Sequence, residues 1–171
     1  IGLATAKMLA EQGASLWING RSADRLTAAR LEILAVAPAA RVQTVLGDVS
    51  TMTGVQAVID DVTDLDILIP MAGGTSNLLP FIELTDEAWQ YQWDYNVMQG
   101  VRLARHYVPQ VLGKDFGRII FMASEAGIVT PPNVVDYGVA KAAVIRLSRV
   151  VAEIFAGSID VTVNCVVPGS I

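Results

Sequence analysis

The feature that most constrains the fold is a regular alternation of short apolar segments with helical ones. The apolar segments include ASLWING (14–20), LDILIPMAGG (65–74) and GRIIFMAS (117–124), and they are apolar on both faces rather than on every second residue. Strands of this kind are typical of a parallel sheet that is covered by helices. The predicted order of elements is αβαβαβααβαβ, which indicates an α/β fold.

Glycine, proline and capping residues mark the boundaries of the predicted helices. Ser22 can cap a helix that runs to about Ala37 and stops at Pro38, while Gly13 and Gly157 are plausible helix ends. No repeat, low-complexity segment or linker interrupts the chain, so we predict a single domain over residues 1–171. The other predicted elements are strands at 41–48 and 159–169, and helices at 3–12, 50–62, 84–112 (one short and one long helix) and 134–157.

Composition excludes several classes of function. The 171 residues carry a net charge of −5, which leaves no basic field to attract nucleic acid or an anionic membrane. No apolar run approaches the roughly 18–20 residues that span a bilayer. A single cysteine, Cys165, and a single histidine, His106, argue against a disulfide framework and against a metal site. The same cysteine content fits a cytoplasmic location.

Polar and small residues follow the predicted strands. The segments NGRS, GDVS, MAGG, MASEAG and VVPGSI each come directly after a strand. In parallel α/β sheets, ligands bind outside the carboxyl ends of the strands. These five segments therefore predict the rim of one binding cleft.

The segment DYGVAKAAVI (136–145) places Tyr137 and Lys141 one helical turn apart, on the same face of a predicted helix. Ser124 ends a predicted strand 13 residues before Tyr137. The Tyr and Lys spacing is unspecific when taken alone, since an exposed amphipathic pair has the same pattern. Together with Ser124, the pair indicates proton-transfer chemistry.

With these residues the sequence resembles the short-chain dehydrogenase/reductase family, in particular its bacterial ketoacyl-carrier-protein-reductase-like branch. The family's catalytic pattern matches Asn96, Ser124, Tyr137 and Lys141, and the resemblance covers essentially the whole chain. It implies a doubly wound, Rossmann-type parallel sheet in three αβα layers. Other family motifs match Asp48-Val49 and Pro168-Gly169.

The chemistry assigns a role to each catalytic candidate. A free phenol titrates near ~10, and a lysine ammonium one turn away favours the phenolate, so Tyr137 would act as the general acid or base. Lys141 would also hold the nicotinamide ribose. Ser124, with Tyr137 and Glu125, would contact the substrate, and Asn96 would hold a water connected to Lys141. The structural alternatives are that Ser124 caps a strand end and that Asn96 is a polar surface position that tolerates a helix bend.

The resemblance implies a dinucleotide cofactor, with NADP favoured over NAD. The segment ASLWING matches the family's second strand, and no carboxylate follows it. Arg21 and Ser22 follow it instead, and they can bind a 2′-phosphate. Alternatively, Ser22 caps a helix, Arg21 is solvated and Asp48 caps the helix that starts near Ser50. The predicted cofactor contacts are Ile1, Gly2, Arg21, Ser22, Asp48, Val49, Ala72, Gly73, Tyr137, Lys141, Pro168, Gly169 and Ile171.

Two departures from the family pattern stand out. Met71 replaces an asparagine whose amide ties adjacent strands, which puts the stability of the cofactor cleft in doubt. The family's first strand and its C-terminal lid and last strand have no counterpart in the sequence. A sheet without its central strand leaves buried backbone groups unpaired, at ~1–3 kcal/mol each. We therefore expect the sequence to be part of a longer protein. At Gly138, the missing side chain is expected to leave room for nicotinamide or substrate.

The sequence thus predicts an oxidoreductase that transfers a hydride between NADP(H) and a carbonyl or secondary alcohol, of the 3-oxoacyl-reductase type. A non-catalytic, redox-sensing dinucleotide module and a sugar-nucleotide isomerase or dehydratase are the alternatives. The resemblance also implies a homotetramer that pairs the long helices. Residues expected to line the substrate pocket besides Glu125 are Ile128, Pro131, Pro132 and Asn133.

Overall fold

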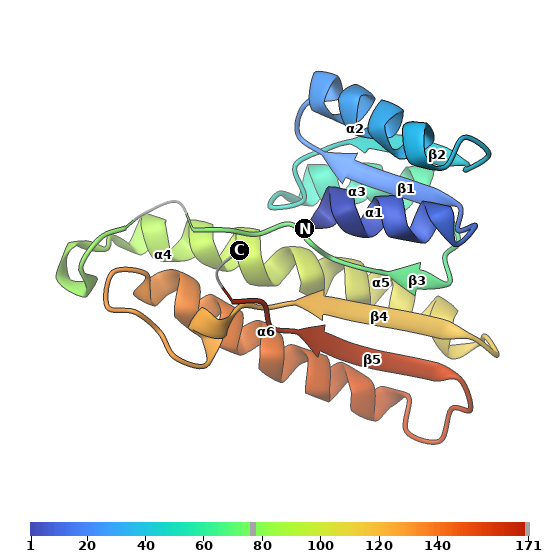
Figure 1. Ribbon diagram of the computed structural model, residues 1–171. Coiled ribbons are helices and arrows are strands. Elements are labelled where there is room, and N and C mark those ends of the chain that lie inside the picture. Colours follow the sequence, from blue (N-terminus) through green and yellow to red (C-terminus); the bar gives the residue numbers. More distant parts are fainter. Residues whose placement is uncertain (76–77, 170–171) are drawn as a thin grey trace. The chain divides into compact units, whose positions relative to one another are not determined.

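The computed structural model describes residues 1–75 and 78–169, and the chain divides into two compact units, Ile1–Thr63 and Asp64–Ile171. The strands of each unit run side by side in the same direction (Figure 1), and every described pairing is parallel. The predicted α/β fold with parallel sheets is therefore confirmed. Each unit has its own hydrogen-bonded sheet, with two strands in the first and three in the second. The single domain over residues 1–171 stays a prediction.

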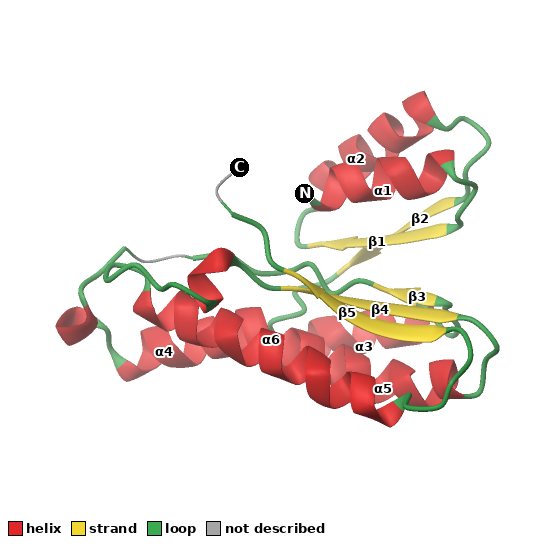
Figure 2. Cartoon of the chain, turned by 60° about the horizontal axis from the view of Figure 1, so that its bottom comes forward, coloured by secondary structure: helices red, strands yellow, loops and turns green. Residues whose placement is uncertain are grey.

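The first unit is a two-stranded parallel sheet with helices on both faces. Its strands pair from Leu16↔Val42 to Gly20↔Leu46. Helices α1 and α2 pack against each other on one face, and α3 lies on the other (Figure 2). The elements are α1 (Gly2–Glu11), β1 (Leu16–Gly20), α2 (Ala23–Val36), β2 (Val42–Leu46) and α3 (Met52–Asp61).

Local chemistry accounts for these boundaries. The Ser22 hydroxyl accepts a hydrogen bond from the backbone N–H of Arg25 and caps α2, as its sequence position predicts. Gly13 follows α1 with a φ of +88°, a conformation that favours glycine. The core beneath α1 and α2 centres on Ile33, which is fully buried and packs with Ala6, Ala10 and Val42.

The second unit is a three-stranded parallel sheet in the order β3-β4-β5. Helices α4, α5 and α6 lie together on one face of this sheet (Figure 2). The longest is α6, with 20 residues, yet no helix in residues 1–75 and 78–169 has the length and apolar character needed to cross a membrane. The elements are β3 (Ile67–Leu68), α4 (Asp86–Trp93), α5 (Gln99–Leu112), β4 (Gly117–Met122), α6 (Val135–Ile154) and β5 (Val161–Val166), with 3₁₀ turns at Phe81–Glu83 and Glu125–Gly127.

Two elements differ from the sequence prediction. The short and long helices of residues 84–112 are present, but a π-helical turn at Asp94–Met98 joins them without a break. No glycine or proline interrupts residues 86–99, so the backbone stays helical through the junction. Strand β3 pairs over two residues only, whereas a strand over 65–74 was expected. Pro70 has no N–H to donate, and the glycines that follow weaken a strand further.

Substitution at Ile33 tests the core of the first unit. We expect Ile33→Ala to lower the free energy of unfolding by about 2–5 kcal/mol, because it removes a fully buried side chain and leaves a cavity. The matched control is Leu31→Ala on the same helix, where the side chain is exposed and the change should stay within about 0.5 kcal/mol. Urea unfolding followed by circular dichroism measures both. Equal effects of the two substitutions would contradict the packing described.

Candidate active site

The strand ends of the second unit meet at one edge of its sheet. Ser124 follows β4, and Pro168 and Gly169 follow β5. The backbone N–H of Glu125 donates to the Pro168 carbonyl at 2.8 Å. A Cβ at Gly169 would lie 3.0 Å from Oε2 of Glu125, so the glutamate side chain lies against that glycine. The structure thus brings the predicted substrate contacts Ser124 and Glu125 next to two predicted cofactor contacts.

The Ser124 side chain has a structural role that leaves its proton available. Its Oγ accepts a hydrogen bond from the backbone N–H of Ala126 at 3.2 Å, which caps the 3₁₀ turn Glu125–Gly127. The capping alternative is therefore realised. A hydroxyl that accepts one hydrogen bond still has a proton to donate, and within the described residues no acceptor takes it. Ser124 can therefore cap the turn and contact a substrate oxygen at the same time.

Tyr137 and Lys141 lie in the first two turns of α6, and only the tyrosine is accessible. The lysine Nζ lies 5.6 Å from the centroid of the Tyr137 ring. Lys141 is 3% exposed, and its Nζ donates to the Met122 carbonyl at the end of β4 at 2.9 Å. No carboxylate pairs with Lys141 in the part of the chain that the structure describes. The exposed amphipathic pair considered from the sequence is therefore wrong for the lysine.

Burial changes the acid strength of this lysine. Removal from water penalises the ammonium form and lowers the pKa of Lys141 from 10.5 to about 8, while the nearby Cys165 thiol acts weakly in the opposite direction. Lys141 therefore still carries its charge at neutral pH, close to the point at which it would lose it. The Cys165 thiol is itself partly buried, and burial raises its pKa.

Two glycines let the Ser124 turn approach α6 closely. A Cβ at Gly127 would lie 2.7 Å from the carbonyl carbon of Lys141, so the turn rests directly on the helix backbone. A Cβ at Gly138 would collide with the Thr130 side chain and lie 2.8 Å from the Ala126 carbonyl oxygen. The expectation that Gly138 leaves room for nicotinamide or substrate is thus wrong, because Thr130 fills that space. The glycine instead allows the turn to pack beside Tyr137.

Asn96 and Gly73 occupy the other side of Lys141. Asn96 is fully buried in the π-helical turn, where its Oδ1 accepts from the Gly74 N–H at 2.9 Å and its Nδ2 donates to the Gly74 carbonyl at 3.1 Å. Gly73 has a φ of +151°, and a Cβ there would lie 2.7 Å from Oδ1 of Asn96 and 2.9 Å from Nζ of Lys141. Only glycine fits this position. The water contact expected of Asn96 stays a prediction.

The segment that contains Met71 has ties that the sequence did not suggest. Gln99 donates its side-chain N–H to the Ala72 carbonyl at 3.1 Å, and Asn96 holds the backbone of Gly74. The amides of the neighbouring helices thus hold residues 72–74, although Met71 cannot supply the family's strand tie. Gln92 also touches Asn96 and was not predicted. A possible signal in the sequence was the spacing of four and three residues that separates Gln92, Asn96 and Gln99.

The cofactor candidates of the first unit gather at the carboxyl ends of β1 and β2. Oδ1 of Asp48 accepts from the N–H and the hydroxyl of Ser50, while its Oδ2 lies 3.9 Å from the Arg21 guanidinium. Asp48 therefore orders the turn before α3, although Thr51 is the residue that caps this helix. Val49 is buried, and a Cβ at Gly54 would collide with the Asp48 backbone, which shows how closely α3 approaches.

The remaining predicted cofactor contacts are the residues at the two ends of the sequence. Gly2 opens α1 after Ile1, and the first turn of this helix carries no acidic residue. Asn19, which the sequence did not single out, ties the strand ends by donating to the Val45 and Gly47 carbonyls. Ile171 lies outside the described residues.

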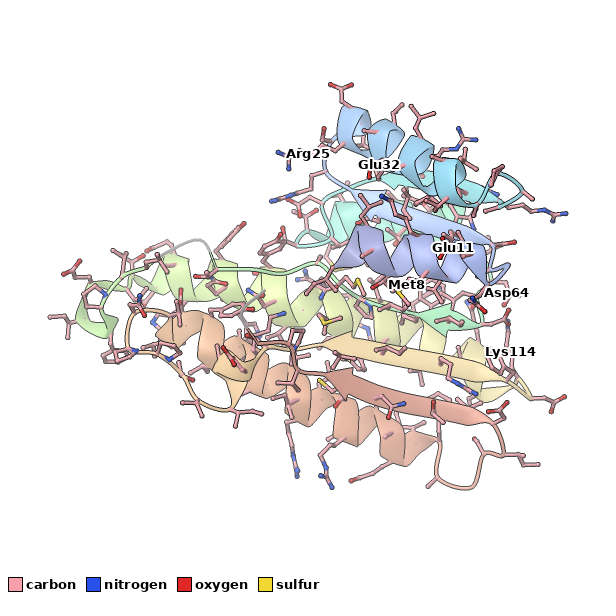
Figure 3. The ribbon with its side chains drawn as sticks, viewed as in Figure 1. Met8, Glu11, Arg25, Glu32, Asp64 and Lys114 are labelled. Carbon is pink, nitrogen blue, oxygen red and sulfur yellow. The ribbon has the colours of Figure 1, made fainter. Side chains whose placement is uncertain are left out.

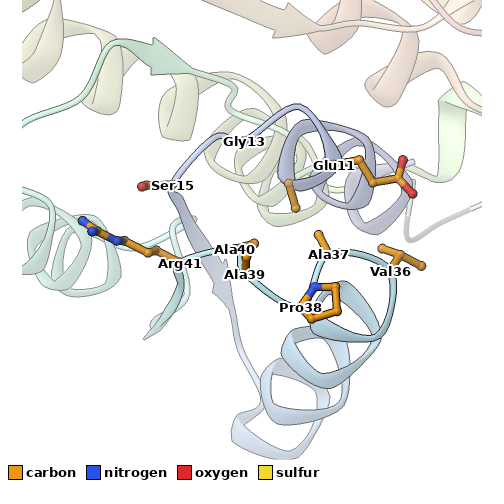
Figure 4. A pocket seen from close by; sticks show the side chains of 10 residues that line it. Glu11, Gly13, Ser15, Val36, Ala37, Pro38, Ala39, Ala40 and Arg41 are labelled. Carbon is orange, nitrogen blue, oxygen red and sulfur yellow. The ribbon is translucent and has the colours of Figure 1, made fainter.

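The amino ends of the strands, opposite the candidate site residues, carry a hollow in the first unit and an ion pair in the second. In the first unit, a shallow hollow of about 570 Å³ lies at the amino ends of β1 and β2, lined mainly by Val36, alanines, Pro38 and Arg41 (Figure 4). In the second unit, Lys114 pairs with Asp64 at 2.7 Å beside the amino end of β3 (Figure 3). This exposed pair lowers the pKa of Asp64 and raises that of Lys114. Neither edge holds a residue of the candidate active site.

The comparisons with known proteins agree with this geometry. The family model described as short chain dehydrogenase matches residues 1–171. The chain belongs to the short-chain dehydrogenase family. An uncharacterised oxidoreductase of Bacillus subtilis, YvrD, is 34% identical over 169 residues, which is 99% of this chain and 64% of that protein. A 3-oxoacyl-[acyl-carrier-protein] reductase of Synechocystis is also 34% identical, over all of this chain and 70% of that protein.

Solved structures of short-chain dehydrogenases share the fold. L-sorbose reductase from Gluconobacter frateurii, solved with NADPH and L-sorbose, superposes with a TM-score of 0.89 at 35% identity. The match covers 98% of this chain and 64% of the reductase. The chain thus spans about 64% of the length of the curated relative YvrD and of this solved reductase.

Titration of Lys141 has a consequence for stability. The pKa of Lys141 is about 8 in the folded chain and near 10.5 in the unfolded one, so between these pH values the unfolded chain binds the extra proton. Stability contributed by this group therefore rises with pH across that window. The variant Lys141→Met has no titratable group at this position. The free energy of unfolding of the variant minus that of the wild type should therefore fall by ~3 kcal/mol as the pH is raised from about 8 to about 10.5. Urea unfolding at a series of pH values measures this, and a difference independent of pH would contradict it.

Proposed function

We propose that this chain is part of an NADP(H)-dependent oxidoreductase that interconverts a carbonyl compound and a secondary alcohol. The observation that carries the proposal is the arrangement around α6. A partly accessible Tyr137 lies beside the buried ammonium of Lys141, and the Ser124 turn packs against the same helix through Gly127. A buried lysine without a carboxylate partner is costly, so its presence beside a tyrosine favours a chemical role over a structural one.

The proposed chemistry needs one proton and one hydride. A bound nicotinamide would supply the hydride for the carbonyl carbon in reduction and would take up the hydride in oxidation. Tyr137 donates its phenolic proton to the oxygen in reduction and removes the alcohol proton in oxidation. Ser124 donates its remaining hydroxyl proton in a hydrogen bond to the oxygen on which negative charge develops. Lys141, charged at neutral pH, stabilises the phenolate that Tyr137 becomes.

The residues present fit a dinucleotide. Gly73 leaves a backbone surface that any side chain would fill, and the first turn of α1 offers N–H groups with no competing carboxylate. Arg21 lies at the surface with its side chain 55% exposed, and its contact with Asp48 is long at 3.9 Å. A surface guanidinium just after the carboxyl end of β1 can reach a 2′-phosphate, to which it can donate two hydrogen bonds. NADP is therefore the proposed cofactor, and the NADPH-bound L-sorbose reductase supports it.

The substrate proposed is a small carbonyl compound or alcohol. The similar proteins include a 3-oxoacyl-[acyl-carrier-protein] reductase and an L-sorbose reductase solved with L-sorbose. Of the predicted pocket residues, Glu125, Ile128, Pro131, Pro132 and Asn133 are all exposed. A cytoplasmic homotetramer is part of the same proposal and rests on the family resemblance.

The acid–base role is tested with Tyr137→Phe. Loss of the phenolic proton should lower kcat by at least about 100-fold, while NADPH binding stays within about twofold of the wild type. Turnover of a panel of ketoacyl thioesters, ketosteroids and sugar ketones gives kcat, and NADPH fluorescence gives binding. Unchanged turnover in the variant rejects the mechanism. NADPH binding by the wild type without turnover of any carbonyl would instead support the non-catalytic, redox-sensing alternative.

The cofactor preference is tested with Arg21→Leu. Removal of the guanidinium should raise KM for NADPH about tenfold and leave KM for NADH unchanged, because only NADPH carries the 2′-phosphate. Arg41→Leu is the matched control, since Arg41 is an exposed arginine at the opposite end of the same sheet. Equal effects on both cofactors would show that Arg21 does not select NADP.

A further inference from the structure

Three buried carboxamides follow one another along the continuous helix formed by α4, the π-helical turn and α5. Gln92, Asn96 and Gln99 are 0%, 0% and 3% exposed. Their spacing of four and three residues places them on one face of the helix. Only Asn96 belongs to the catalytic pattern, so the two glutamines need an explanation of their own.

Each of the three amides makes a contact in the same small region. Oε1 of Gln92 accepts from Nδ2 of Asn96 at 2.5 Å, and the Gln92 carbonyl accepts from the same nitrogen at 3.2 Å. These contacts fix which side of the Asn96 amide faces Gln92. Oδ1 of Asn96 is then directed to the Gly74 N–H, and Gln99 donates to the Ala72 carbonyl on the same segment.

The segment held in this way forms one wall around Lys141. A Cβ at Gly73, between the two held residues, would lie 2.9 Å from the lysine Nζ and 2.7 Å from Oδ1 of Asn96. On its other side the ammonium donates to the Met122 carbonyl. A displacement of residues 72–74 would therefore open the space around the ammonium to water.

We propose that Gln92 and Gln99 are positioning residues, which with Asn96 clamp residues 72–74 and thereby hold Lys141 in place beside Tyr137. This inference rests on the proposed function for its catalytic consequence, but the clamp itself does not. Gln92 acts through Asn96, and Gln99 acts directly on the backbone of Ala72. The clamp also takes the place of the strand tie that Met71 cannot supply.

The decisive measurement is hydrogen exchange at the Gly74 amide, which donates to Asn96. The variant Gln92→Met has a similar length and volume but lacks the side-chain acceptor for Nδ2 of Asn96. It should speed exchange of the Gly74 amide about tenfold in the full-length protein, followed by NMR or mass spectrometry. Gln90→Met is the matched control. Gln90 lies on the same helix but is exposed and bonds Asp94, so exchange at Gly74 should stay unchanged.

A second pair of variants keeps the test decisive if Gln92→Met does not fold. Gln92→Glu retains an acceptor oxygen and should keep the exchange rate within about twofold of the wild type. Gln99→Met removes the bond to Ala72 and should speed exchange at Gly74 on its own. In both methionine variants we expect kcat per folded enzyme, counted by titration of NADPH-binding sites, to fall about tenfold with KM for NADPH unchanged, an effect that a smaller folded fraction does not produce.

The outcomes separate the clamp from the proposed function. Unchanged exchange at Gly74 in Gln92→Met and Gln99→Met would overturn the clamp, whatever the activity. Faster exchange with unchanged kcat would also overturn the positioning role. If the wild type turns over no carbonyl, the proposed function fails, and the exchange rates still decide whether the clamp exists.

Discussion

The buried ammonium of Lys141 is the interaction around which the second unit is arranged. A charge inside a protein is costly unless hydrogen bonds or opposite charges compensate for it, and among the described residues this lysine has the carbonyl of Met122. That carbonyl belongs to the last residue of β4, so the ammonium is held at the carboxyl end of the sheet. The lysine reaches it because α6 packs against β4 and β5. The position of the catalytic candidates thus follows from the way one helix lies on one sheet.

Close backbone approaches make that arrangement possible. Gly73 admits the ammonium and the Asn96 amide, Gly127 lets the Ser124 turn rest on α6, and Gly138 accepts the Thr130 side chain. At each of these positions a Cβ would lie within 3 Å of another atom. Well-packed interiors accommodate such an overlap only by moving the neighbouring side chains off their rotamers or by shifting the backbone. Gly127 and Gly138 therefore determine how closely the Ser124 turn lies to α6, and Gly73 determines how closely residues 72–74 lie to the ammonium of Lys141.

Much of the fold could be predicted from the sequence because its signals are local. Ser22 caps α2 as expected, and the apolar segments form parallel strands. The π-helical turn at Asp94–Met98 and the shortness of β3 were missed. A π turn inserts one residue into a helix whose composition is otherwise ordinary, so no local pattern marks it. The shortness of β3 agrees with Pro70 and the glycines after it, which the apolar character of the segment outweighed in the prediction.

By itself, the sequence determined the α/β class, the family, and the residue types at the ends of the strands, because these depend on periodicity and on short motifs such as Tyr137 with Lys141. Only the tertiary structure decided what surrounds them. It buried Lys141 against Met122, filled the space beside Gly138 with Thr130, and brought Gln92 and Gln99 to the interior beside Asn96. These outcomes depend on how helices, turns and strands pack against one another, and burial lowers the pKa of a lysine that the sequence shows only as a charge.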